Sequence, residues 1–153
     1  MSIFSFVKDA GKKLLGRGDD NEAIKEEIES SFGDIPVQGL VVEVDDGKVV
    51  LAGVAKDIPT REKCILIAGN VEGVESVDAE QLVSPEIIEA ENVRDLPEPV
   101  FYTIKKGDSL WKIASHFYND GSKYTVIFEA NREVIKDPDK IYPKQTIRIP
   151  QIA

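Results

Sequence analysis

Residues 101–114 read FYTIKKGDSLWKIA and contain the pattern that decides the fold of the last third of the chain. The first five of these residues alternate like a β-strand. Gly107-Asp108 predict a turn, and Asp108 is placed to cap the helix that follows. The expected apolar face of that helix consists of Leu110, Ile113, Ala114 and Phe117.

A second helix and a closing strand complete this unit. Asn119-Asp120-Gly121 predict a turn, because these residue types are typical of turns. The next helix is expected to have one face made of Tyr124, Ile127, Phe128 and Asn131. Ile147 and Ile149 belong to a strand that ends before Pro150. The order strand, helix, helix, strand predicts a small α+β domain over residues 100–153.

This stretch resembles the LysM module, which usually binds N-acetylglucosamine glycans. The matched residues, in order, are Tyr102, Ile104, Gly107-Asp108-Ser109-Leu110, Ile113-Ala114, Asn131, Ile141, Pro143, Gln145 and Ile147-x-Ile149-Pro150. The resemblance implies sugar contacts from two loops, which here contain Gly107, Asp108, Ser109 and Leu110, and Lys140, Ile141 and Tyr142. The structural alternative is that Leu110 and Ile141 belong to the core and Asp108 is only a cap.

Lys144 departs from the LysM pattern, which commonly has glycine between the positions of Pro143 and Gln145. A turn that needs a positive φ would be strained by a lysine, at a cost of about 1 kcal/mol or more.

Residues 19–83 predict a second α+β domain. Asp19-Asp20-Asn21-Glu22 provide capping groups for a helix over residues 22–32. A hairpin is expected over residues 40–54, where Asp46-Gly47 are the preferred pair for a two-residue type I′ turn. This register would place Asp45 opposite Lys48.

A second helix of this domain is expected from Pro59 to Ala68, with Gly69-Asn70 ending it because both tolerate the left-handed conformation. A third strand follows over residues 75–83. The order helix, strand, strand, helix, strand resembles the BON domain. The residues that carry this resemblance are Ala52-Gly53-Val54 after the hairpin and residues 68–77, AGNVEGVESV.

Two segments lie outside these domain patterns. Residues 3–15 predict a short helix that ends at Gly16. Residues 84–99 contain prolines and acidic side chains, which stiffen and extend a chain, and they predict a linker. The expected organisation is a BON-like αββαβ domain with an N-terminal helical segment over residues 1–83, the linker over 84–99 and a LysM-like βααβ domain over 100–153.

The charge of the chain is unevenly distributed. Residues 1–95 contain 10 basic and 21 acidic residues, whereas residues 96–153 contain 9 basic and 7 acidic ones. An acidic N-terminal half repels nucleic acids and anionic membranes, so we expect neither as a partner. The first residues, MSIFSFVKDAGKKLL, lack the apolar run of an export signal, which predicts a cytoplasmic protein. We also expect a monomer.

Catalytic residues are not apparent in the sequence. His116 is the only histidine and Cys64 the only cysteine, so neither a zinc site nor an internal disulfide can form from them. Cys64 stands among Ile65, Leu66 and Ile67 and is expected to be a buried structural thiol. Ser109 and His116 do not form a triad with Asp108, because they stand about two helical turns apart. We therefore predict a binding protein and not an enzyme.

The combination of the two domains resembles a family of bacterial cytoplasmic potassium-binding proteins. The opening residues 6–11, FVKDAG, and the stretch KDPDKIYPKQ at 136–145 extend the resemblance over nearly the whole chain. It implies selective binding of K⁺, with larger alkali cations as further candidates, and a more compact conformation when the ion is bound. The implied ligands are the main-chain carbonyls of Val7, Lys8, Ala10, Gly69, Val71 and Val74.

The chemistry of such a site is consistent with these residues. K⁺ is weakly hydrated, and a ring of neutral carbonyls can replace its water shell, whereas a carboxylate cage favours Mg²⁺ or Ca²⁺. Helix ends near Ala10-Gly11 and Ala68-Gly69 would direct carbonyls with partial negative charge into one space. Two alternatives stay open at this point. Gly69 and Gly73 can be simply a helix cap and a turn, and glycan binding can be the function.

Overall fold

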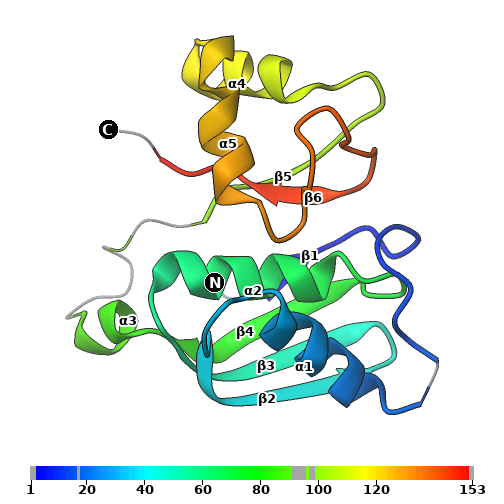
Figure 1. Ribbon diagram of the computed structural model, residues 1–153. Helices are drawn as coiled ribbons and strands as arrows, with labels where there is room; N and C mark the ends of the chain where they lie inside the picture. Colours follow the sequence, from blue (N-terminus) through cyan, green and yellow to red (C-terminus); the bar gives the residue numbers. More distant parts are fainter. Residues whose placement is uncertain (1–2, 17, 91–95, 97–98, 152–153) are drawn as a thin grey trace.

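The computed structural model describes residues 3–16, 18–90, 96 and 99–151. The chain folds into two α/β units, an N-terminal unit below and a C-terminal unit above in Figure 1. This is the predicted α+β class with two small domains.

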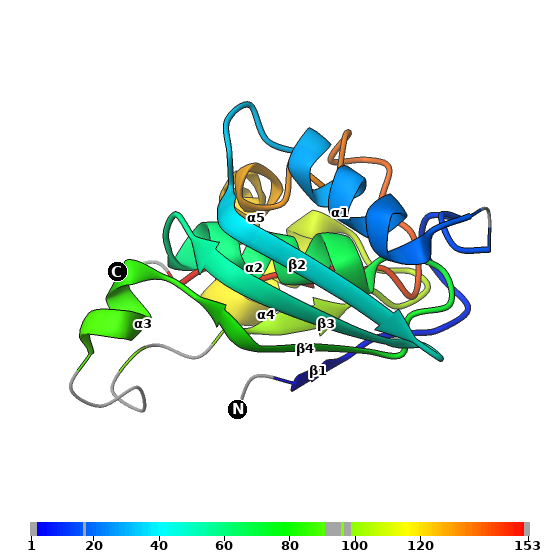
Figure 2. The same cartoon turned by 90° about the horizontal axis from the view of Figure 1, so that it is seen from below.

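The N-terminal unit is a four-stranded sheet with two helices on one face (Figures 1 and 2). In chain order its elements are β1 (Ile3–Ser5), α1 (Asp20–Ser30), β2 (Val37–Asp45), β3 (Lys48–Ala55), α2 (Ile58–Gly69) and β4 (Ser76–Val83). The strands lie in the order β1-β4-β3-β2. Strands β3 and β4 are parallel, because α2 crosses over between them, and the other neighbours are antiparallel.

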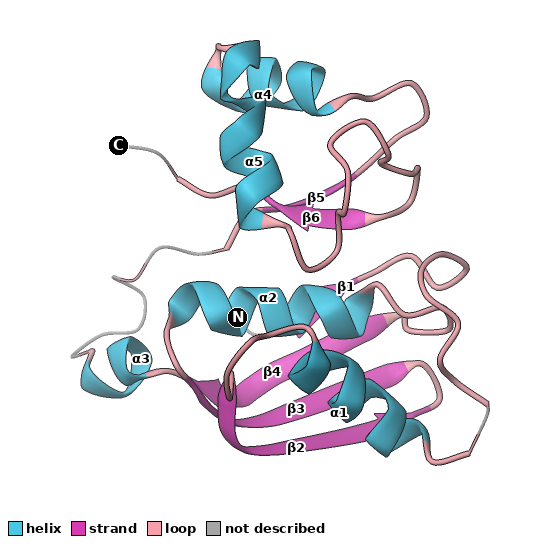
Figure 3. Ribbon diagram, in the orientation of Figure 1, coloured by secondary structure: helices cyan, strands magenta, loops and turns pink. Residues whose placement is uncertain are grey.

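The C-terminal unit has a two-stranded antiparallel sheet and two helices, joined by a 3₁₀ turn (Figure 3). Its elements are β5 (Phe101–Thr103), α4 (Leu110–Tyr118), η2 (Gly121–Lys123), α5 (Tyr124–Ala130) and β6 (Thr146–Arg148). The predicted linker contains a further helix, α3 (Pro85–Glu89). Residues 91–95, 97 and 98 of that linker lie outside the described part of the chain.

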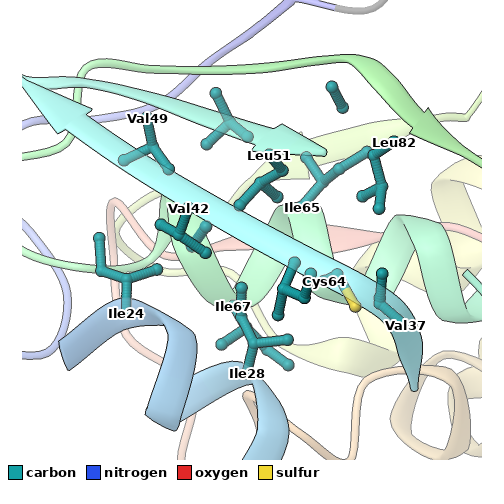
Figure 4. Close-up of a cluster of buried hydrophobic side chains, with 14 of the residues drawn as sticks. Ile24, Ile28, Val37, Val42, Val49, Leu51, Cys64, Ile65, Ile67 and Leu82 are labelled. Atoms are coloured by element: carbon teal, nitrogen blue, oxygen red, sulfur yellow. The ribbon is translucent and has the colours of Figure 1, made fainter. Parts of the chain in front are cut away.

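Each unit has its own apolar core. In the N-terminal unit α1 contributes Ile24 and Ile28, which pack against the sheet and α2 (Figure 4). Cys64 is fully buried there, as predicted, and burial raises the pKa of its thiol to about 12. In the C-terminal unit the core contains Ile104, Leu110, Ile113, Ala114, Ile127, Ile135, Ile147 and Ile149.

Several local predictions are confirmed. Asp46 and Gly47 both have a positive φ, at 44° and 83°, and Asp45 pairs with Lys48 across the turn. The side chain of Asp19 caps α1 by accepting a hydrogen bond from the backbone N–H of Glu22. These features form locally because a few neighbouring residues determine them.

The helix predicted over residues 3–15 was wrong. Residues 3–5 form β1, which pairs antiparallel with β4, and the rest of the segment runs through turns. Its backbone groups bond to distant residues instead of to each other. For example, the N–H of Phe6 donates to the carbonyl of Glu75 at 2.8 Å. Gly11, at φ +103°, also adopts a conformation that a right-handed helix excludes.

Two predicted helix caps also differ in the structure. Ser109, and not Asp108, caps α4 by accepting a hydrogen bond from the N–H of Lys112, while Asp108 binds Tyr102 and the N–H of Lys105. Asn70 follows α2 with φ −86°, which is not the left-handed conformation expected at this position. A left-handed helix cap therefore does not explain the residue types at Gly69 and Asn70; their contacts, described below, do.

Candidate functional site

The N-terminal segment, residues 6–12, lies along the turn that follows α2. The N–H of Lys12 donates to the carbonyl of Asn70 at 2.8 Å, and the carbonyl of Lys12 accepts from Glu72 at 2.9 Å. These two bonds make a parallel bridge between Lys12 and Val71. The carbonyl of Lys8 accepts from the N–H of Gly73 at 2.7 Å. Two segments that are far apart in sequence are therefore joined through their main chains.

Glycines permit this close approach. A Cβ on Gly69 would lie 2.1 Å from the ring of Phe6, so this glycine leaves room for an aromatic side chain of the N-terminal segment. A Cβ on Gly11 would lie 2.1 Å from the carbonyl oxygen of Asn70. Any larger residue at either position would push the two segments apart. The sequence pattern alone suggested a simple helix cap at Gly69, but Gly69 is the last residue of α2, and the contact with Phe6 explains why it is a glycine.

The six carbonyls named from the sequence belong to these two segments. Val7, Lys8 and Ala10 are in the N-terminal segment, and Gly69, Val71 and Val74 are at the end of α2 and in the turn after it. Three of these carbonyls, those of Val7, Lys8 and Val71, accept backbone hydrogen bonds from Ala10, Gly73 and Val74. A carbonyl oxygen has two lone pairs, so such a bond leaves one available for a ligand.

One of the two expected helix ends is present. Gly69 is the last residue of α2, and the final carbonyls of a helix carry partial negative charge. The N-terminal segment contributes carbonyls from turns and not from a helix, because the predicted helix there is absent. Within the described residues, no three His, Cys, Asp or Glu side chains gather where they could hold a metal ion.

The C-terminal unit packs against the side of α2 that faces away from the sheet, so that α2 lies between the large sheet and β6 (Figure 1). The guanidinium of Arg148 donates to Glu62 with 2.9 Å between Nε and Oε1, and both side chains are about nine-tenths buried. Lys63 forms an ion pair with Glu133 at 3.0 Å. Hydrogen bonds also join the Asn70 side chain to the backbone of Thr146.

The N-terminal segment also contacts the C-terminal unit directly. The ring centroid of Phe101 lies 5.1 Å from that of Phe4, in β1, and 6.5 Å from that of Phe6. Lys144 has φ +74°, the conformation that a lysine adopts only with strain, and its ammonium group lies 2.9 Å from the carboxylate of Asp9. The hydrogen bond and charge of Lys144 lower the pKa of Asp9. The segment therefore lies between the two units and touches both.

A cavity of about 580 Å³ opens where these parts meet. Ala10, Gly11 and Lys12 form one wall, and α1 and α2 contribute others. The C-terminal unit supplies the remaining walls through Glu133, Val134, Lys136, Tyr142, Pro143 and Gln145. The cavity therefore exists only when the two units are docked as in this structure.

Comparison with known proteins identifies both units. Residues 19–84 match the model of the BON domain, and residues 102–150 match that of the LysM domain. The chain is 36% identical over 157 residues to the "Potassium binding protein Kbp" of Escherichia coli, and the alignment covers 99% of each protein. The chain belongs to this family of BON–LysM proteins.

Two further relatives share only part of the chain. An uncharacterized protein of Deinococcus radiodurans is 39% identical over 87 residues, which are 55% of this chain and 33% of that protein. Protein YqbP of Bacillus subtilis, also uncharacterized, is 39% identical over 62 residues, which are 35% of this chain and 28% of that protein.

The family names, BON, LysM and potassium binding protein, describe binding modules and not enzymes. Among the described helices, each is too short or too polar to cross a membrane.

The LysM domain has a separate groove of about 480 Å³. Four of the predicted sugar-contacting residues line it, namely Asp108, Ser109, Leu110 and Ile141, together with Trp111 and Tyr124. Gly107 and Lys140 are not among the lining residues, and Tyr142 lines the interdomain cavity instead. Leu110 is only 2% exposed, so it belongs to the core, as the structural alternative proposed.

Asp108 has a structural role at the edge of this groove. Its carboxylate accepts a hydrogen bond from the hydroxyl of Tyr102 at 2.6 Å, which lowers the pKa of Asp108 and raises that of Tyr102 to about 12. The backbone N–H of Lys105 donates to the same oxygen. Asp108 therefore closes the turn between β5 and α4.

Sequence reasoning missed the residues that join the two domains. Arg148 is the last residue of β6 and stands between Ile147 and Ile149 in the sequence. The alternation of side chains along a strand would place it on the solvent face. All three residues of β6 are buried, because α2 covers the second face of the strand. A charged residue in a short apolar strand was the available signal, but it could not identify Glu62 as its partner.

The buried ion pair between the BON and LysM domains can be tested by Glu62→Leu. This change leaves the Arg148 guanidinium buried without its carboxylate, which typically costs about 3–5 kcal/mol. Separation of the domains would return Arg148 to water, so we expect a larger radius of gyration in small-angle X-ray scattering. The matched control is Glu129→Leu, because the ion pair of Glu129 with Arg132 is exposed on both sides. An unchanged radius in Glu62→Leu would contradict this role of the pair.

Proposed function

We propose that the protein binds K⁺ selectively through the backbone carbonyls of Val7, Lys8, Ala10, Gly69, Val71 and Val74. The observation that carries this proposal is the pairing of the N-terminal segment with the turn after α2, since the six residues come from these two segments. The relative that aligns over 99% of the chain is named for potassium binding, which supports the same ligand.

The chemistry of the two segments suits a large monovalent cation. Neutral carbonyl oxygens can replace the weakly held water shell of K⁺, and the end of α2 adds partial negative charge. Divalent cations prefer carboxylate ligands, which the proposed ring does not use. Larger alkali cations have the same coordination needs as K⁺ and are further candidate ligands.

In this proposal the bound ion favours the compact arrangement of the two domains. The N-terminal segment contacts the LysM domain through Phe6 and Asp9, so an ion that orders this segment also orders part of the interface. Ion binding and docking then stabilise each other. A cytoplasmic monomer with this property could sense or buffer K⁺.

The proposal is tested by calorimetric titration with KCl and with NaCl at matched ionic strength. We expect heat from saturable binding with KCl and a much weaker response with NaCl. Gly69→Val should weaken K⁺ binding at least tenfold, or about 1.4 kcal/mol, because the new side chain displaces Phe6 and its segment. Gly33→Val is the matched control, because a Cβ at Gly33 meets no atom within 4 Å. Equal weak responses of the native protein to both salts would contradict potassium selectivity.

Glycan binding is a second candidate function, and the groove of the LysM domain favours it. Trp111 is 55% exposed and lies 6.2 Å from Tyr124, between ring centroids, so the groove presents aromatic surface. Aromatic faces and a few polar groups are typical of small-molecule sites. The test is a titration with N-acetylglucosamine oligomers, followed by amide chemical shifts. Saturable shifts at Ser109 and Trp111 would support this function, and unchanged shifts at millimolar ligand would exclude it.

A further inference from the structure

Asn70 stands between two of the proposed potassium ligands, Gly69 and Val71. Its backbone N–H donates to the carbonyl of Leu66 at 2.9 Å and so ends α2. Its own carbonyl accepts from the N–H of Lys12 at 2.8 Å, which fixes the N-terminal segment. The main chain of one residue therefore connects the helix end with the segment that supplies Val7, Lys8 and Ala10.

The side chain of Asn70 connects the same point to the LysM domain. Its Nδ2 donates to the carbonyl of Thr146 at 2.8 Å, and its Oδ1 accepts from the N–H of Thr146 at 2.9 Å. Nδ2 also donates to Leu66 at 3.0 Å. Thr146 pairs with Thr103 of β5 on its other side, so the Asn70 amide bonds the edge of β6 as a neighbouring strand would.

The backbone of Asn70 gives no separate reason for an asparagine here. Asparagine is often found after helices because it tolerates the left-handed conformation. Asn70 has φ −86° and ψ 24°, a conformation with negative φ that does not require asparagine or glycine. The amide group, with one donor and one acceptor matched to the backbone of Thr146, is the feature that other residue types would lose.

We propose that Asn70 is a positioning residue that couples docking of the LysM domain to the geometry of the potassium site. This inference rests on the proposed function. When the LysM domain is docked, Thr146 fixes the Asn70 side chain, and Asn70 in turn fixes the carbonyls on either side of it. Coupling between two events is reciprocal, so the bound ion must favour docking by the same factor that docking favours the ion.

A variant that opens the interface can separate the proposed coupling through Asn70 from an effect of Asn70 within the BON domain alone. Glu62 lies on α2 about two turns before Asn70, and its partner Arg148 is on β6. Glu62→Leu is expected to open the interface, which also separates Phe6 from Phe101 and Asp9 from Lys144, but it leaves the main-chain bonds between residues 8–12 and 70–73 in place. In the Glu62→Leu protein the LysM domain is expected to be undocked, so Thr146 no longer bonds the Asn70 side chain.

The experiment is a double-mutant cycle in the full-length protein, with K⁺ affinity measured by calorimetry. The four proteins are the native chain, Asn70→Ala, Glu62→Leu and the double variant. We expect Asn70→Ala to weaken K⁺ binding about tenfold in the native background and less than twofold when Glu62 is already replaced. Asn21→Ala is the control for loss of a side-chain amide, because Asn21 bonds the N–H of Val44 inside the BON domain.

A second readout follows docking itself. Addition of KCl should reduce the radius of gyration of the native protein, and this reduction should be smaller in Asn70→Ala. A tenfold loss of affinity in both backgrounds would show that Asn70 acts only within the BON domain, and it would overturn the coupling. A native protein that does not distinguish KCl from NaCl contradicts the proposed function itself, whereas an Asn70→Ala protein with native affinity contradicts only the coupling.

Discussion

The main-chain pairing of residues 8–12 with residues 70–73 is the constraint on which the rest of the structure depends. It holds a segment without regular secondary structure against the end of α2, and it requires glycine at positions 11 and 69. Because backbone groups make the pairing, it joins the two main chains and leaves the side chains free for other contacts. The side chains of Phe6, Asp9 and Asn70 contact the LysM domain at Phe101, Lys144 and Thr146.

Docking of the LysM domain combines apolar contacts of Phe101 and Val134 with polar contacts, among them a buried ion pair. The buried pair of Glu62 and Arg148 must offset the desolvation of two charges, so it is sensitive to the loss of either partner. Lys144 adopts a positive φ, at a cost of about 1 kcal/mol, and its ion pair with Asp9 is exposed. Such an interface can be shifted by a ligand that supplies a modest coupling energy, typically about 1–3 kcal/mol.

Lys144 shows how a departure from a family pattern can acquire a role. A glycine at this position would relieve the backbone but offer no charge. The lysine instead brings its ammonium group to Asp9, the residue between two proposed ligand carbonyls, Lys8 and Ala10. The strain predicted from the sequence is therefore present, and the structure adds the contact that offsets part of it.

Local chemistry in the sequence predicted the β-hairpin, the Asp19 cap and most of the apolar face of α4, because neighbouring residues determine these features. Leu110, Ile113 and Ala114 are buried as expected, whereas Phe117, predicted on the same face, is exposed. The N-terminal segment was predicted as a helix and is not one, since its hydrogen-bond partners are in a turn near residue 72. The groove of the LysM domain was predicted in part: resemblance identified Asp108 and Ile141 but not Trp111. The partners Glu62 and Arg148 could not be paired from the sequence, because only the docked arrangement buries them together.

The most direct test of the potassium site is the ¹³C chemical shift of each backbone carbonyl during a KCl titration of the native protein, with total ionic strength held constant by choline chloride. The account predicts that the largest saturable changes occur at residues 7, 8, 10, 69, 71 and 74, all with one dissociation constant. Changes confined to acidic side chains, or spread evenly over the chain without saturation, would contradict it.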